Sequence, residues 1–455
     1  MTTGEGGEQR PDSAQQVVDE GQADTSPETA TGADAAGRRV EGQKPAAEQR
    51  NVLRGFVRSV TTAGSVWVSI LAVFTAFVLG AILIVLSDQD VLAKLGYFFA
   101  APGDALSAAA TDIRTAYGAM FRGSIVDPSA VSALISGHGS WTSVFYPFSE
   151  TVANATPLML ASLAVALGFR SGLFNIGAEG QMIAGGVLAG WVGFSMPHLP
   201  FPIPLLAALL AGFAGGAIWG GFAGLLRAKT GAHEVITTIM LNYIAVQLLL
   251  YLLNSSAFQR PGRTDPISRP VQVASRLPHL ATDALRVNGG IVLALGIAAL
   301  MWWILARSTL GFEVRAVGSN PDAARTAGMD VGGTYTRVMG LAGGFAGLGG
   351  AALILGLQYS LVPDFTSNIG FDAITVALLG RSTAVGVVLG ALLFGALHAG
   401  GIQMQAATQT PVDVVTVIQS LTVLFIAAPA VVKAVYRLRG GAATSQQPTT
   451  KGWAS

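Results

Sequence analysis

The sequence has 455 residues, of which 51% are hydrophobic and 12% charged, and its mean hydropathy is +0.54. Several windows of about 18 residues carry almost no charge, which is long enough to cross a bilayer core of ~30 Å. This composition excludes a soluble globular domain and predicts an all-α, polytopic membrane protein. The absence of cysteine excludes disulfides and thiolate metal sites, so no metal is predicted, and a net charge of +1 gives no reason to expect nucleic acid.

The two ends of the chain differ from its middle. Residues 1–49 are rich in Gly, Ala, Glu, Asp, Gln and Thr and have almost no large apolar side chains. Such a segment cannot bury enough apolar surface to fold, so a disordered acidic tail is predicted. Residues 440–455 form a second polar tail that is also predicted to be disordered. Residues 50–439 between them are the predicted transmembrane domain.

Ten membrane spans are predicted, and several of their helices are expected to be short or broken. In chain order they are 66–86, 152–169, 179–196, 205–226, 235–253, 290–306, 336–357, 365–379, 384–403 and 412–432. Basic residues precede the first span (Arg50, Arg54, Arg58) and follow the last (Lys433, Arg437, Arg439), so the positive-inside rule predicts that both termini are cytoplasmic. The same orientation places Arg170, Arg227, Lys229, Arg307 and Arg381 on the cytoplasmic side.

Three longer connections are predicted. Segments 87–150 and 254–288 lie outside, the first with amphipathic helices and the second with five arginines, which runs against the charge rule although that rule weakens in longer loops. Segment 307–335 lies in the cytoplasm. There Ser319 or Asn320 can cap a two-turn helix over 321–327 that Gly328 ends. This helix either fills the loop or docks a cytoplasmic partner.

The most informative motif is the polar, glycine-rich stretch 173–182, which stands between the apolar runs 157–167 and 182–196. Such backbone is tolerated within a membrane domain only where protein buries it or it lines a water-filled cavity. Two interpretations stay open: a broken helix that carries solute, as in many transporters, or a tight cytoplasmic turn. Asn175, Glu179 and Gln181 are the candidate solute-path residues.

Other polar residues within the spans should face the interior, because each would cost several kcal/mol against lipid. Amides donate and accept hydrogen bonds, so they suit a neutral solute with hydroxyl groups, although bonding between helices is an equally good explanation for any one of them. Asn242, Asp372 and Gln403 are weaker path candidates, and the remaining members are Asn154, Gln247, Gln358 and Gln405.

Small residues form a stripe on the fourth span, where Gly212, Gly216, Gly220 and Gly224 recur every four residues. This spacing puts all four on one helix face, which another backbone can approach closely. Static packing within the bundle is favoured over a sliding or dimer-forming surface. No nucleotide-binding signature is present, because 224–230 lacks the Gly-Lys pair of a P-loop, so any action of ATP requires another subunit.

Five blocks resemble one known family in the same order along about residues 65–435. They are Gly-Leu-Phe-Asn-Ile-Gly-Ala-Glu-Gly-Gln at 172–181, the His-Glu-Val-Ile-Thr-Thr block at 233–243, and the blocks at 318–328, 370–381 and 401–405. The chain resembles the permeases of ABC importers of the branched-chain amino acid and simple sugar group. The nearest resemblance is to the bacterial nucleoside (guanosine-type) permeases.

The resemblance implies a multi-pass permease of the bacterial plasma membrane that catalyses no bond chemistry and holds no cofactor. It implies a second permease subunit in a heterodimer, a cytoplasmic ABC ATPase that binds ATP and magnesium, and an extracytoplasmic solute-binding lipoprotein. It also implies a coupling helix that seats in the ATPase, formed by Ser319, Asn320, Pro321, Ala323, Ala324, Arg325 and Gly328.

Other functions stay open on the sequence. Within the same class, the solute could be a simple sugar or a branched-chain amino acid. An ion-coupled secondary transporter would need inward-facing ionisable residues, and only Glu179 and Asp372 qualify. The buried amides argue against a membrane scaffold without transport.

Overall fold

The computed structural model describes residues 65–196, 199–408, 410–411 and 413–437. The predicted tails 1–49 and 440–455 lie outside these residues. Within them the regular elements are helices, and β pairing is limited to two isolated bridges, Gln259 with Ser268 and His279 with Asn288. The predicted all-α class is confirmed.

The helices follow one another with short connections except at two places, before α10 and before α14. They are α2 (Ser65–Ser87), α3 (Gln89–Leu95), α4 (Pro102–Ser124), α5 (Pro128–Ile135), α6 (Trp141–Arg170), α7 (Ala178–Ser195), α8 (Ile203–Thr230), α9 (Glu234–Leu253), α10 (Gly290–Arg307), α11 (Thr309–Ser319), α12 (Pro321–Thr326), α13 (Val331–Leu353), α14 (Ile369–Leu379), α15 (Ala384–Thr408), α16 (Asp413–Ala427) and α17 (Pro429–Val435). A π-helical turn over Ile354–Gln358 extends α13.

Seven helices of the described chain are long and apolar enough to span a membrane: α2, α6, α8, α9, α10, α13 with its π-helical turn, and α15. The other three predicted spans fall on α7, on α14 and on the pair α16 and α17. Of these, α14 and α16 are apolar but short. A multi-pass membrane protein is therefore confirmed, whereas ten crossings and cytoplasmic termini stay predictions.

The eighth predicted span, 365–379, is wrong at its start. The helix begins only at Ile369, and residues 359–368 before it are not helical. Asn368 at the boundary has φ 63°, a left-handed conformation that a continuous helix does not contain. With 11 residues at 1.5 Å each, α14 is about 16 Å long, roughly half of a bilayer core. It is a half-helix that follows a run of turns over residues 363–368.

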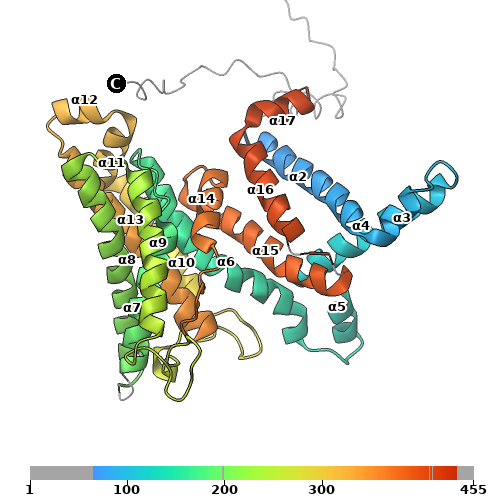
Figure 1. Ribbon diagram of the computed structural model, residues 1–455, viewed down its shortest axis with the longest axis horizontal. Coiled ribbons are helices and arrows are strands. Elements are labelled where there is room, and N and C mark those ends of the chain that lie inside the picture. Colours follow the sequence, from blue (N-terminus) through green and yellow to red (C-terminus); the bar gives the residue numbers. More distant parts are fainter. Residues whose placement is uncertain (1–64, 197–198, 409, 412, 438–455) are drawn as a thin grey trace, which may run out of the picture. The chain divides into compact units, whose positions relative to one another are not determined.

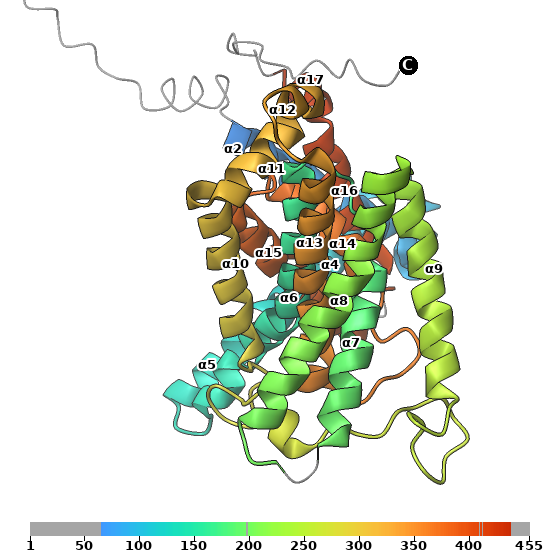
Figure 2. The same cartoon turned by 90° about the vertical axis from the view of Figure 1, so that its left-hand side faces the viewer.

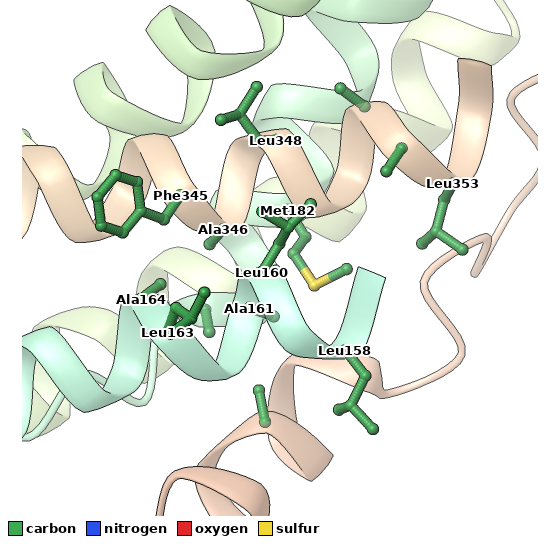
Figure 3. Close-up of a cluster of buried hydrophobic side chains, with 14 of the residues drawn as sticks. Leu158, Leu160, Ala161, Leu163, Ala164, Met182, Phe345, Ala346, Leu348 and Leu353 are labelled. Carbon is green, nitrogen blue, oxygen red and sulfur yellow. The ribbon is translucent and has the colours of Figure 1, made fainter. Parts of the chain in front are cut away.

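Two helices, α6 and α13, form the centre of the bundle and are buried along most of their length. Figure 3 shows Leu160 and Leu163 of α6 with Phe345 and Leu348 of α13, and Met182 of α7 packed between them. Helices α7, α8 and α9 stand beside this pair, and α11 and α12 lie at one end of them (Figure 1, Figure 2). The 254–288 segment lies at the opposite end, as its predicted external position requires.

The glycine stripe of α8 packs against α13, as the views of Figures 1 and 2 both allow. A Cβ atom on Gly216 would overlap the carbonyl oxygen of Gly343, and one on Gly220 would overlap that of Met339. The other two glycines meet the same helix: Gly212 faces Ala351, and Gly224 faces Thr336 and Met339. The two backbones therefore touch, with no layer of side chains between them.

Segment 87–150 contains the helices α3, α4 and α5, as predicted, and α4 packs along α15. Met120 of α4 meets Gly400 so closely that a Cβ there would lie 2.5 Å from the Met120 carbonyl oxygen. The segment is thus part of the packed structure rather than a loose external layer.

Segment 254–288 is irregular, and it hydrogen-bonds to the non-helical segment before α14. The N–H groups of Ser268 and Val271 donate to the carbonyls of Leu361 (3.0 Å) and Tyr359 (2.8 Å). Two of its five arginines form ion pairs. Arg263 donates to Asp265 at 2.6 and 2.7 Å and holds the pKa of that carboxyl below its usual value, and Arg286 lies 3.5 Å from Glu150.

Because α8 packs so closely on α13, adding one methyl group to the contact face of α8 should destabilise the protein, whereas adding one elsewhere on α8 should not. Gly216→Ala should lower the free energy of unfolding by ~1–3 kcal/mol, because the new Cβ overlaps the α13 backbone. The matched control is Gly221→Ala on the same helix, where the nearest atom would be 3.8 Å away. Thermal unfolding in detergent measures both, and equal midpoints for the two variants would contradict backbone contact.

Candidate functional site

The motif that the sequence singled out forms a turn. Residues 171–177 connect α6 to α7, beside the end of α11. A Cβ on Gly318 of α11 would overlap the carbonyl oxygen of Arg170, and Gly172, with φ 76°, packs on Gly318. Of the two open interpretations, the structure therefore has the turn between two helices rather than a break within one.

At this turn the side-chain amides of Asn175 and Gln181 bond to each other, and that of Asn242 bonds to the backbone. Asn175 and Gln181 exchange two hydrogen bonds of 3.0 Å, and Asn175 also accepts from the Gly177 N–H at 3.1 Å. Asn242 of α9 accepts from the Gly180 N–H and donates to the Ile176 carbonyl, both at 2.9 Å. Because these amides are buried and bonded, the cluster fixes where α7 begins.

Glu179 links α7 to the half-helix α14. One carboxylate oxygen accepts from the Gly370 N–H at 2.7 Å, and the other accepts from the Thr366 hydroxyl. Gly370 lies in the first turn of α14, where unpaired N–H groups and the helix dipole favour a negative charge. The buried carboxylate thus caps α14 and sets the position of the residues that follow.

Two cavities adjoin α6, and the second of them also adjoins α14. The first cavity, about 420 Å³, lies between α4, α6 and α15, and its polar lining is Arg122, Asp127, Tyr146, Glu150, Arg286 and Gln403. The second cavity, about 210 Å³, lies between α6, α14, α15 and α16, and its polar lining includes Asn154, Gln358, Asp372, His398 and Gln419. Phe365 and Phe394 supply apolar walls to the second cavity.

Arg286 lines both cavities and so marks where they adjoin. Its guanidinium lies 3.5 Å from the carboxylate of Glu150 on α6, and its backbone N–H donates to the Ser149 hydroxyl at 3.3 Å. The Arg286 side chain is about half exposed, so solvent screens this ion pair and its net contribution to stability is small.

Three polar side chains of the second cavity differ from the amides of the turn because they have no hydrogen-bond partner in the described part of the chain. Asp372, His398 and Gln419 make no hydrogen bond or ion pair with any residue that the structure describes. They come from three different helices, α14, α15 and α16. Their donors and acceptors are accessible from the cavity and open to a solute, which makes this cavity the stronger candidate for binding one.

The six predicted path residues therefore fall into two groups. Asp372 and Gln403 line the second and the first cavity, whereas Asn175, Glu179, Gln181 and Asn242 line neither. The expectation that all polar span residues are buried in the interior is wrong for three of them on this chain. Gln247, Gln403 and Gln405 are exposed, although Gln403 also lines the first cavity.

Sequence reasoning missed His398 and Gln419, although both are polar side chains inside apolar runs and meet the criterion that selected the others. It noted Arg286 only as one of the external arginines, since no sequence pattern indicates that a loop residue reaches a cavity. In the described residues no group of His, Cys, Asp or Glu has the arrangement of a metal site.

The predicted cytoplasmic helix is present as α12. Asn320, rather than Ser319, caps it, accepting from the N–H groups of Asp322 and Ala323 at 3.0 Å. Gly328 follows the helix with φ 85°, as expected of the residue that ends it. The structure adds α11 before α12, which the sequence had not indicated.

The two alanines of α12 have different surroundings. Ala323 is exposed, whereas Ala324 is buried against Val317 of α11 and Val331 of α13. The free face of α12 therefore carries Ala323 but not Ala324.

A family model with the description branched-chain amino acid transport system / permease component matches residues 148–428. That range contains the turn, α12, α14, the whole lining of the second cavity and about half of the lining of the first. The chain belongs to this family of transport permeases. The assignment favours an ABC importer permease, which is not itself an enzyme, over a secondary transporter or a scaffold. It places the permease in the plasma membrane as a multi-pass protein.

Curated relatives share much of the permease. The guanosine ABC transporter permease protein NupP of Bacillus subtilis is 41% identical over 65% of this chain and 86% of its own length. The nucleoside ABC transporter permease protein NupB of Lactococcus lactis is 36% identical over 64% and 81%. The glucose ABC transporter permease protein TsgB13 of Haloferax volcanii is 37% identical over 71% and 83%. No solved structure matches.

Each of these three relatives has a second permease from the same organism among the matches. For TsgB13 it is TsgC13 of Haloferax volcanii, which is 29% identical to this chain. NupQ of Bacillus subtilis is 29% identical to this chain, and NupC of Lactococcus lactis is 26% identical. The pairs NupP with NupQ and NupB with NupC point to a second permease subunit as the partner of a chain of this kind.

The amide pair generates a prediction about stability. Gln181→Leu should lower the free energy of unfolding by ~1–3 kcal/mol, because the Asn175 amide is then buried without its partner. In a protein that already carries Gln181→Leu, the change Asn175→Ala should lower the free energy of unfolding by less than it does in the wild type, since the hydrogen bonds between the two amides are already lost. Thermal unfolding of both single variants and the double variant measures this coupling. Asn254→Ala, an exposed amide at the end of α9, is the control, and strictly additive losses would contradict the pairing.

Proposed function

We propose that the permease is the membrane subunit of an ATP-driven importer for nucleosides. It receives solute from an extracytoplasmic solute-binding lipoprotein and passes it to the cytoplasm. A cytoplasmic ABC ATPase binds ATP with magnesium and drives the cycle, and a second, related permease completes the membrane part as a heterodimer. Both termini and segment 307–335 lie on the cytoplasmic side, where the ATPase is.

The observation that carries the transport role of this chain is the pair of adjoining cavities that share Arg286. The polar lining of the second cavity consists mainly of neutral donors and acceptors, with two aromatic rings beside them, which suits a neutral heterocyclic solute, and the first cavity adds Tyr146 and Gln403 among charged residues. The solute path therefore follows Gln403 and Asp372. Four other polar residues act on the solute path indirectly, because they fix the positions of α7 and α14: Asn175, Glu179, Gln181 and Asn242.

The nucleoside assignment is supported by the two relatives whose names give guanosine and nucleosides. The glucose permease of Haloferax volcanii, at 37% identity, favours one alternative, a simple sugar. The deciding measurement is uptake of radiolabelled guanosine by cells that lack their own nucleoside uptake and express the permease with its partner permease, ATPase and binding protein. Excess unlabelled uridine should inhibit this uptake, and excess glucose or leucine should not. Inhibition by glucose alone, with no guanosine uptake, would select the sugar alternative.

The coupling role is assigned to α12, because this capped helix presents a free face at the end of the bundle that carries α11 (Figure 1). Arg170 joins that end to the cavities: its backbone packs on Gly318, and its side chain donates to the Ser382 carbonyl between α14 and α15 at 2.9 Å. Displacement of α11 and α12 by the ATPase can thus reach both α7 and α14 through contacts that already exist.

Replacing Ala323 with Asp should abolish ATPase association and reduce uptake at least tenfold, equivalent to ~1.4 kcal/mol. The residue is exposed, so the protein should still accumulate in the membrane at its normal level. Ala281→Asp, the same change on the exposed external segment, is the control. Copurification of the ATPase and uptake are measured together, and normal values of both for Ala323→Asp would show that the ATPase docks elsewhere.

A further inference from the structure

We propose that the second cavity binds the vicinal hydroxyl groups of a ribose, with Asp372, His398 and Gln419 as the residues that hold them. The inference rests on the proposed nucleoside function and states which part of the solute this cavity takes. It assigns roles to His398 and Gln419, which lie outside the motifs of the sequence.

The first argument is the contrast between this cavity and the turn. In the turn, the amides of Asn175 and Gln181 satisfy each other and leave little to offer a solute. In the second cavity, the side chains of Asp372, His398 and Gln419 converge from α14, α15 and α16 and bond to none of the described residues. A bound solute would form hydrogen bonds with these unpaired donors and acceptors.

The second argument is the kind of hydrogen bond that these groups make. An ionised carboxylate only accepts, a side-chain amide donates and accepts, and an imidazole does either according to its tautomer. A hydroxyl group donates to one partner and accepts from another through the same atom, whereas a ring N–H only donates and a ring carbonyl only accepts. Two neighbouring hydroxyls can donate to the two oxygens of Asp372 while they accept from Gln419 and His398.

The third argument is size. The second cavity, about 210 Å³, is smaller than the ~300–1,000 Å³ of sites that enclose drug-sized ligands. It can take a sugar ring, with Phe394 as an apolar wall, but not a whole nucleoside. The first cavity, about 420 Å³, adjoins it at Arg286 and offers the ring of Tyr146 for the base to stack on. The solute would therefore lie across both cavities, with the ribose inside the second.

The test compares two solutes with the same base. The complete importer, reconstituted in proteoliposomes with its ATPase, partner permease and binding protein, is supplied with guanosine or with 2′,3′-dideoxyguanosine. The wild type should take up guanosine at least tenfold faster. Asp372→Asn keeps the side-chain volume but removes one acceptor oxygen, and it should bring the ratio of the two rates close to one. Gln419→Leu should lower the same ratio, which provides a second variant if the first does not accumulate.

Asp265→Asn, the same change on the external segment, is the matched control and should keep the wild-type ratio. A wild-type importer that takes up no nucleoside would overturn the proposed function and this inference with it. If the wild type takes up nucleosides but Asp372→Asn and Gln419→Leu both keep its ratio, only the ribose assignment fails. A change in the ratio of guanosine to adenosine uptake, with no change in the dideoxy ratio, would show that the cavity holds the base and would also overturn the assignment.

Discussion

Backbone contact between α8 and α13 is the constraint on which the other positions in the bundle depend. Within a membrane the hydrophobic effect does not drive helices together, because lipid tails are as apolar as leucine. Close approach of small residues supplies van der Waals contact instead, and here Gly216 and Gly343 remove the side chains that would prevent it. Gly350 of α13 meets the Met182 carbonyl of α7 in the same way. Three helices are thus fixed against one another with no layer of side chains that could rearrange.

The position of the second cavity depends on the contacts among α7, α8 and α13. Glycine packing fixes α7, the amide cluster at its start fixes the turn, and Glu179 then holds the first turn of α14. At the other end of α14, Arg170 of α6 holds the Ser382 carbonyl. The half-helix that carries Asp372 is therefore attached at both ends to α6 and α7. Because Arg170 also adjoins α11, a displacement of α11 can shift Asp372 of α14 relative to His398 of α15 and Gln419 of α16.

Hydropathy was sufficient to predict where most spans lie, because a long uncharged run has few alternatives to a membrane helix. The cap of α12 was also predictable, since Asn320 followed by Pro321 is a local pattern. The break before α14 had a local signal, because Pro363, Asp364, Ser367 and Asn368 are turn-forming residues, but hydropathy alone placed the start of the span within them. The sequence could not separate Gln181 from Asp372. Both are polar groups in apolar surroundings, and the packing of the helices decides which of them has a hydrogen-bond partner within the protein.

The hydrogen bonds to Tyr359 and Leu361 divide segment 254–288 into two parts with different uses in the laboratory. Residues 261–264 form an exposed tip, with Gly262 at φ 79°, and none of their N–H groups bonds to the segment before α14. Ser268 and Val271, only a few residues later, bond directly to Leu361 and Tyr359. An epitope or a fluorescent protein inserted at 262–264 should leave the fold undisturbed. The same insertion at 268–271 would remove the hydrogen bonds to Leu361 and Tyr359 and loosen the attachment of α14.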